Sequence, residues 1–193
     1  MKILHVANKY DYGKPELGFS NEYINLYKTL VQMNGGENEI LLYSIDVMIK
    51  KKDAEGLNKE LLYLVFKEKP NLIFVSNGMR VIKKEVMKEI TQKSGAVTFT
   101  WSFDDHWAFH KGLKHLAHFF HWIFTTDPLA IEKYQKIGYQ NAVFIPQGFN
   151  HFLYKPLNLP KIYDVTFVGR PHGNRRKIIK KLKKAGINVV CFG

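Results

Sequence analysis

The sequence is poor in cysteine and has no long apolar run. Its one cysteine, Cys191, excludes an intrachain disulfide framework and a zinc site built from cysteines. The sequence has no run of about 18 apolar residues, the length needed to span a membrane. The opening "MKILHVA" is too short an apolar stretch for a secretory leader. These absences predict a cytoplasmic protein of a reducing compartment, without a transmembrane segment.

Arginine is also scarce. The formal net charge is +12, but only four of the 29 basic residues are arginine, and the lysines are spread along the chain. Recognition of phosphates and base edges tends to use the forked guanidinium of arginine. The charge therefore predicts a general attraction to anions and no specific nucleic-acid partner.

Two glycine-rich fingerprints of nucleotide-binding proteins are missing. Residues 8–18 contain Gly13 and Gly18, but their spacing is not G-x-G-x-x-G. The chain has no G-x-x-x-x-G-K-[ST] loop either, which argues against a P-loop ATPase. The loop at 8–18 remains open to two interpretations, an anion site at a helix start or a plain connection.

The sequence does contain a regular alternation of β-rich runs and helical patterns. Runs rich in valine, isoleucine and phenylalanine predict strands at 2–7, 39–44, 71–76, 96–101, 121–126 and 142–146. The spacing of apolar residues predicts helices at 19–33, 54–69, 81–90 and 127–138. Strands that are apolar on both faces and separated by helices predict an α/β fold, a Rossmann-like doubly wound parallel sheet.

The pattern changes after the sixth expected strand. We expect an N-terminal domain at 1–150, a proline-containing linker at 151–162, and at 163–193 the first strand, helix and strand of a truncated second Rossmann-like domain. Ligands of doubly wound sheets bind beyond the carboxyl ends of the strands. One rim of the first domain should therefore carry the loops at 8–18, 76–80, 102–112 and 147–151.

The segment "TWSFDDHWAFHKG" at 100–112 is the most unusual. It places Asp104, Asp105 and His106 directly after an expected buried strand, among Trp101, Phe103, Trp107 and Phe109. A carboxylate or imidazole in such a setting can act as a general base, and aromatic faces beside carboxylates suit a sugar ring. In the alternative interpretation, one aspartate caps the next helix and the aromatic side chains are core.

Histidines are dense from 106 to 121, at positions His106, His110, His115, His118 and His121. Spacings of three and four could place pairs on one helical face, as metal ligands require. However, the segment is not expected to be one continuous helix and no cysteine assists. Packing or surface roles are the preferred interpretation, and we expect no bound metal.

The segment "VGRPHGNRRK" at 168–177 follows the first strand of the second expected domain. Gly169 and Gly173 allow backbone N–H groups to face an anion, and the helix that begins near 174 adds its positive end. Arg170 and Arg175 can make bidentate phosphate contacts. The alternative is a basic, solvated helix start, because five lysines follow between 177 and 184.

Four segments together resemble a known family. They are, in order, "GFSNEYINLYKTL", "TWSFDDHW", "FTTDPLAIEKYQKIGYQNAVFIPQGFN" and "YDVTFVGRPHGNRRKIIKKLKKAGINV". In that order they resemble the CgeB-like glycosyltransferases of the spore-maturation type, over nearly the whole chain. That family is similar to GT-B glycosyltransferases, in which two Rossmann-like domains face each other across a cleft.

The resemblance implies transfer of a sugar from a nucleotide-diphosphate donor to a hydroxyl of an unknown acceptor, without a metal or other cofactor. The implied catalytic residues are Asp105, Asp104 and His106. The implied donor-diphosphate site comprises Gly169, Arg170, Gly173 and Arg175. The implied acceptor-side loops carry Gly18, Glu22, Trp107 and Gln147.

The resemblance also implies that most of the donor domain is missing after residue 193, so the chain alone should not be a competent enzyme. A non-catalytic module that binds a glycan or an anionic polymer is the alternative, and a histidine-ligated metalloprotein is a third hypothesis. An incomplete second sheet would leave Val189, Val190 and Phe192 poorly covered. We therefore expect self-association through that edge.

Overall fold

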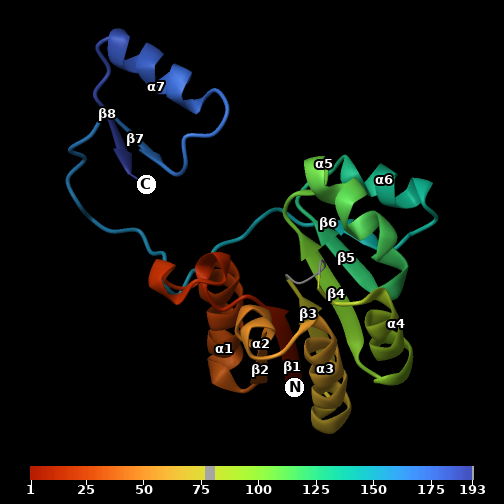
Figure 1. Ribbon diagram of the computed structural model, residues 1–193. Coiled ribbons are helices and arrows are strands. Elements are labelled where there is room, and N and C mark those ends of the chain that lie inside the picture. Colours follow the sequence, from red (N-terminus) through yellow and green to blue (C-terminus); the bar gives the residue numbers. More distant parts are fainter. Residues whose placement is uncertain (77–80, 193) are drawn as a thin grey trace. The chain divides into compact units, whose positions relative to one another are not determined.

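The computed structural model of the protein (Figure 1) describes residues 1–76 and 81–192. The chain forms two compact units, Met1–Tyr154 and Lys155–Gly193. Residues 77–80, which are most of the loop expected at 76–80, and the terminal Gly193 lie outside the described residues.

The larger unit is built on a six-stranded, entirely parallel sheet. Its strands are β1 Lys2–Ala7, β2 Glu39–Ser44, β3 Leu72–Val75, β4 Val97–Ser102, β5 Trp122–Thr125 and β6 Ala142–Phe144. Their spatial order is β2-β1-β3-β4-β5-β6, so the direction of winding reverses between β1 and β3. All six strands lie where the sequence predicted them, in a Rossmann-like α/β fold.

Helices connect the strands of the larger unit (Figure 1). They are α1 Lys28–Gln32, α2 Ile45–Lys51, α3 Ala54–Glu68, α4 Lys84–Lys93, α5 Asp105–Ala108 and α6 Ala130–Lys136. The longest, α3, begins where the carboxylate of Asp53 accepts the backbone N–H of Gly56 at 2.7 Å. It ends at Lys69, which adopts a left-handed conformation (φ 46°) directly before Pro70.

One face of the sheet forms the main hydrophobic core against α3 and α4. Alternate strand residues such as Leu4, Val6 and Ile73 point to this face and are buried. They meet apolar side chains at helical spacing, namely Leu57, Leu61 and Val65 of α3 and Val86, Met87 and Ile90 of α4. Complete burial of each such side chain stabilises the fold by about 1.5–3 kcal/mol.

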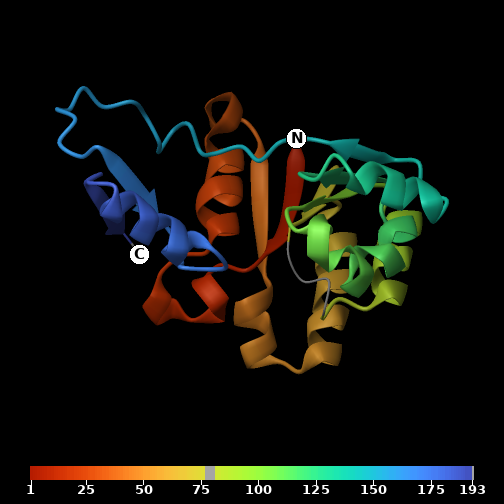
Figure 2. The ribbon, with the colours of Figure 1, turned by 90° about the horizontal axis from the view of Figure 1, so that it is seen from above.

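The opposite face of the sheet carries rings. The imidazole of His5 stacks on Phe74, with ring centroids 4.7 Å apart, and on Tyr27 at 6.3 Å. The row continues through neighbouring stacked or edge-on rings, Phe99 and Phe124 on one side and Tyr23, Phe19 and Tyr10 on the other. Helical cover on this face comes from the segment that includes Tyr27, and α1 lies alongside β2 (Figures 1 and 2).

Several helices differ from the sequence predictions. Helix α4 spans Lys84–Lys93 instead of 81–90, and the short α5 was not predicted. The expected helix at 19–33 is a π-helix, Glu22–Tyr27, followed by α1. The amide of Asn150 donates to the carbonyl of Ile24 at 2.9 Å, which gives the wider helical turn a partner from a distant part of the chain. Helix α2 was not predicted, and α6 begins at Ala130 instead of near 127.

The smaller unit is a strand–helix–strand. It comprises β7 Val165–Val168, α7 Arg175–Lys184 and β8 Val189–Phe192. The two strands pair in parallel, with Val165 opposite Val189 and Val168 opposite Phe192. Within the residues that the structure describes, no helix is both long enough and apolar enough to cross a membrane.

Candidate functional site

The larger unit has a cavity of about 880 Å³ at the carboxyl ends of β1, β3 and β4. It lies where the order of the strands reverses, which is the usual ligand position in such sheets. Its walls come from the loop after β1, the start of the π-helix, α2, the end of β3 and the segment that follows β4. Of the four loops predicted to share a rim, those at 8–18 and 102–112 line this cavity, as does Ser76 at the start of the loop predicted at 76–80, whereas no residue of 147–151 is among the lining residues.

The carboxylate of Asp46 holds the loop after β1 in place. This side chain is 6% exposed and accepts the backbone N–H groups of Lys9 (2.8 Å) and Tyr10 (2.9 Å) and the hydroxyl of Ser44 (2.8 Å). These three hydrogen bonds offset the free-energy cost of removing the carboxylate from water. Asp46 was not predicted from the sequence, because α2, whose first turn carries this residue, was not predicted. The available signal was an aspartate two residues after an expected strand.

Gly13 is the point at which the same loop approaches α2. Its φ is +69°, and a Cβ atom there would lie 3.2 Å from the Cβ of Asp46. The ammonium of Lys50 also donates to the Gly13 carbonyl. Glycine is therefore required for both conformation and space at this position, and the loop is fixed as one wall of the cavity.

The two aspartates of the 100–112 segment lie in different environments. Asp104 is exposed and lines the cavity. Asp105 is 1% exposed, and the hydroxyl of Tyr134 donates to its carboxylate at 3.0 and 3.1 Å from the two oxygens. Burial, and then the charge of Asp105, raise the pKa of the Tyr134 hydroxyl far above its ordinary range, so this hydroxyl stays a donor. Asp105 thus anchors the segment to α6.

Aromatic side chains line the same cavity as the exposed Asp104. Trp107 is 49% exposed and lines the cavity with Trp101 and Phe103, whose rings are 5.2 Å apart. The ammonium of Lys111 lies 5.6 Å from the centroid of the Trp107 ring, within the range of a cation–π contact. Both the aspartates and the aromatic residues therefore lie at the cavity, as the sequence led us to expect, although Phe109 is buried in the core.

A buried histidine lies under the cavity. His5 is fully buried, and its Nε2 is 2.8 Å from the hydroxyl oxygen of Ser76, which lines the cavity. Burial lowers the pKa of His5 to about 3, so the ring is neutral at pH 7. The sequence analysis did not single out His5, which sits in mid-strand among apolar residues.

The predicted acceptor-side residues divide into two groups. Glu22 and Trp107 line the cavity. Gly18 (φ 85°) and Gln147 are exposed and are not among the lining residues, and neither is His106. The cavity therefore gathers the carboxylate and aromatic part of the prediction around the ends of β1 and β4.

The predicted diphosphate residues lie in the smaller unit, in the loop between β7 and α7. Gly169 (φ 136°) and Gly173 (φ 57°) both adopt positive φ, which suits glycine. The guanidinium of Arg175 donates to the carbonyl of Arg170 at 2.8 Å and lies over the ring of Phe167 at 5.8 Å. Arg175 thus closes the loop on itself, and the loop is exposed to solvent.

Two of the clustered histidines bind backbone and side-chain groups of the fold. His118 Nε2 is 3.0 Å from the carbonyl of Ile137, and His121 Nδ1 accepts the backbone N–H of Thr98 at 3.0 Å. In the described part of the chain, no three histidine, cysteine, aspartate or glutamate side chains converge as a metal site would require.

The larger unit is therefore an α/β unit of the Rossmann type with a cavity of carboxylates and aromatic rings at its switch point. Over 73 residues the chain is 30% identical to spore protein CgeB of Bacillus subtilis strain 168. The match covers 37% of this chain and 23% of CgeB, so it spans less than a quarter of that protein. No protein-family model matches the chain. The finding supports a CgeB-like relationship over part of the chain.

Proposed function

We propose that the protein is the acceptor half of a GT-B glycosyltransferase together with the start of its donor half. The observation that supports this most directly is the cavity at the strand-order reversal, which is lined by both the exposed Asp104 and the half-exposed Trp107. A carboxylate can accept a hydrogen bond from a sugar hydroxyl, and an aromatic side chain can pack against the apolar face of a sugar ring. The resemblance of the sequence motifs to those of the CgeB-like glycosyltransferases is the second support for the proposal.

In this proposal the oxygen of an acceptor hydroxyl attacks the anomeric carbon of the donor sugar. The bond between that carbon and the diphosphate oxygen breaks, and its electron pair leaves with the nucleotide diphosphate. Asp104 takes the hydroxyl proton, because it is the aspartate that solvent and acceptor reach. Asp105 and His106 are the alternative bases.

The leaving diphosphate would bind to the loop between β7 and α7. Backbone N–H groups near Gly169 and Gly173 and the side chains of Arg170 and Arg175 supply donors and positive charge there. Trp107 and Glu22 would hold the acceptor, with Gly18 and Gln147 farther from the reacting hydroxyl. No bound metal is part of the proposal.

The test is sugar transfer by the natural gene product that contains these residues, measured with a panel of nucleotide-diphosphate sugars. We expect Asp104→Asn to lower kcat at least about 100-fold, the contribution of a general base. Glu132→Gln, which removes an exposed carboxylate of α6, is the matched control and should stay active.

Two outcomes would change the proposal. Full activity of Asp104→Asn with an inactive, folded Asp105→Asn would move the base to Asp105. Glycan binding without transfer from any donor would replace the enzyme with a non-catalytic glycan-binding module.

A further inference from the structure

Positive charge is concentrated in the smaller unit. Residues 155–193 contain ten of the 29 lysines and arginines and a single carboxylate, Asp164. This unit therefore carries a formal charge of +9 out of the chain's +12. The larger unit is nearly balanced, so the even spread of lysines along the chain does not give an even spread of net charge.

Helix α7 carries most of that charge. Seven of its ten residues are lysine or arginine, none is acidic, and all seven are exposed. Among the residues that the structure describes, no carboxylate forms an ion pair with this helix. Asp164 instead accepts the backbone N–H of Asn188 at 3.2 Å. The like charges on such a helix repel one another and destabilise it, and binding to an anionic partner would stabilise it.

The same region also exposes apolar groups. Ile178 on α7 is 55% exposed. A cleft of about 560 Å³ beside α7 has a floor that includes Phe167, Ile179 and Cys191, and its wall includes Lys180 and Lys183. Upstream of β7, Leu157, Leu159 and Ile162 are each more than two-thirds exposed. In the cleft beside α7, cationic side chains therefore lie next to apolar ones.

We propose that α7 and the cleft beside it bind the protein to a membrane surface that carries anionic phospholipids. A basic amphipathic helix lies in the headgroup layer when its lysines meet anionic headgroups and its apolar side chains enter the acyl boundary. A nucleic acid would use the charge but not the exposed aliphatic groups. Lysine also outnumbers arginine in this unit, which favours diffuse attraction over forked recognition of single phosphates.

The 193-residue chain can be tested by co-sedimentation with lipid vesicles. We expect binding to vesicles of equal parts phosphatidylglycerol and phosphatidylcholine, and none to phosphatidylcholine alone. Raising the salt concentration well above about 0.1 M should release much of the protein, because the Debye length then falls below about 10 Å. A vesicle-free sample run in parallel measures sedimentation by self-association alone.

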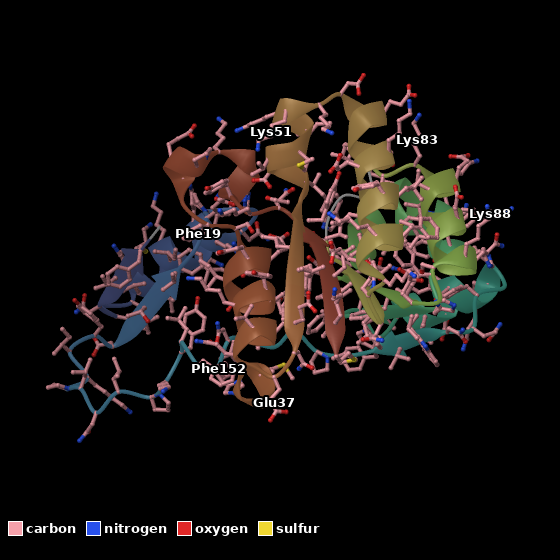
Figure 3. The ribbon with its side chains drawn as sticks, turned by 90° about the horizontal axis from the view of Figure 1, so that it is seen from below. Phe19, Glu37, Lys51, Lys83, Lys88 and Phe152 are labelled. Carbon is pink, nitrogen blue, oxygen red and sulfur yellow. The ribbon has the colours of Figure 1, made fainter. Side chains whose placement is uncertain are left out.

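Two variants with the same total charge separate location from net charge. The first replaces Lys177, Lys180 and Lys181 of α7 by glutamine. The second replaces three exposed lysines of the larger unit, Lys51, Lys83 and Lys88, which point outward in Figure 3. We expect the α7 variant to bind anionic vesicles about 100-fold more weakly, at about fivefold per lysine. The control variant should bind within about threefold of the original protein, because a distant surface charge acts only through the screened field.

Three results would overturn the proposal. Equal weakening by both variants would show that net charge alone is responsible. Binding to neutral vesicles as tight as to anionic ones would remove the role of the lysines. Tighter binding of a single-stranded RNA than of anionic vesicles at the same salt concentration, lost in the α7 variant, would assign the surface to nucleic acid.

Discussion

Asp104 and Asp105 are adjacent in the chain, but their different surroundings give them different roles. Asp104 is exposed at the cavity, whereas Asp105 is buried under the hydroxyl of Tyr134. The ring of Phe109 packs edge-on against the ring of Tyr134, with the ring centroids 5.0 Å apart. A buried carboxylate depends strongly on its donor, so the pair should matter most for stability.

Tyr134→Phe removes the hydroxyl that donates to Asp105. We expect the free energy of unfolding to fall by about 2–4 kcal/mol, because a buried charge loses its hydrogen bond. Tyr139→Phe is the matched control. Its hydroxyl donates to the neutral carbonyl of Phe120 at 3.2 Å, so a loss of only about 1 kcal/mol is expected. Urea denaturation measures both, and equal losses would contradict the special role of Asp105.

His5 should make stability depend on pH. The unfolded chain binds a proton at His5 as the pH falls below the ordinary pKa of 6.5, whereas the folded protein does not until about 3. Falling pH therefore favours the unfolded state across that window, by up to about 1.4 kcal/mol per pH unit.

The variant His5→Phe keeps a ring between Phe74 and Tyr27 but cannot be protonated. Its unfolding free energy should fall less steeply than that of the original protein between pH 6.5 and about 3, as measured by denaturant titration at several pH values. Parallel curves for the two proteins would show that His5 is not the titrating group.

At the scale of elements, helix α2 determines the conformation of the loop after β1. Asp46 binds two of its N–H groups, and Lys50 binds the carbonyl of Gly13. Tyr10 of this loop is also one end of the row of rings, which reaches the sheet through the contact of Tyr27 with His5. Because these contacts come from two sides, the loop should respond to any side chain inserted between it and α2.

Gly13→Ala tests that dependence. The new Cβ would meet Asp46 at 3.2 Å in a left-handed conformation, and we expect a loss of about 2–3 kcal/mol in unfolding free energy. Gly95→Ala is the control, because Gly95 has a similar φ of +75° with nothing within 4 Å of the added atom. Gly95→Ala should lower the unfolding free energy by only about 1 kcal/mol, the cost of placing an alanine at positive φ. Equal losses, measured by thermal or urea unfolding, would mean that the approach to Asp46 is not tight.

Local pattern explains which elements could be predicted. The strands and α3 have apolar residues at their own period, and the ends of α3 carry a cap and a proline. The segment "IDVMIKK" of α2 is too short to show a helical period. The π-helix has as its partner Asn150, which lies 126 positions away from Ile24. At the site, the carboxylates and rings could be predicted, but the burial of Asp105 depends on Tyr134, 29 positions away.

At the scale of the whole molecule, the two units differ in stability as well as in charge. The larger unit contains the six-stranded sheet and nearly all of the buried side chains. The smaller one has a two-stranded sheet and one helix with no fully buried residue. Two strands and one helix bury too little apolar surface for much stability of their own.

Brief digestion with trypsin should therefore cut between the units or within the smaller one. Lys161 is exposed in a stretch without helix or strand and is followed by isoleucine, so we expect cleavage there first; Lys155 precedes Pro156, and trypsin cuts poorly before proline. Mass spectrometry should detect a resistant product that contains the larger unit and ends at Lys161, with a formal charge of +5. Initial cuts inside β1 to β6 would contradict the division into units.

The row of eight rings from Tyr10 to Phe124 has an optical consequence. Aromatic side chains held in fixed, close geometry give near-ultraviolet circular dichroism, and that signal disappears when packing loosens while helices and strands persist. Four of the rings belong to the loop after β1 and to the π-helix, which contribute other residues, such as Asn8, Gly13 and Glu22, to one wall of the cavity. The protein therefore contains its own spectroscopic reporter of that wall, and a ligand that rearranges it should change the tyrosine bands without any attached dye.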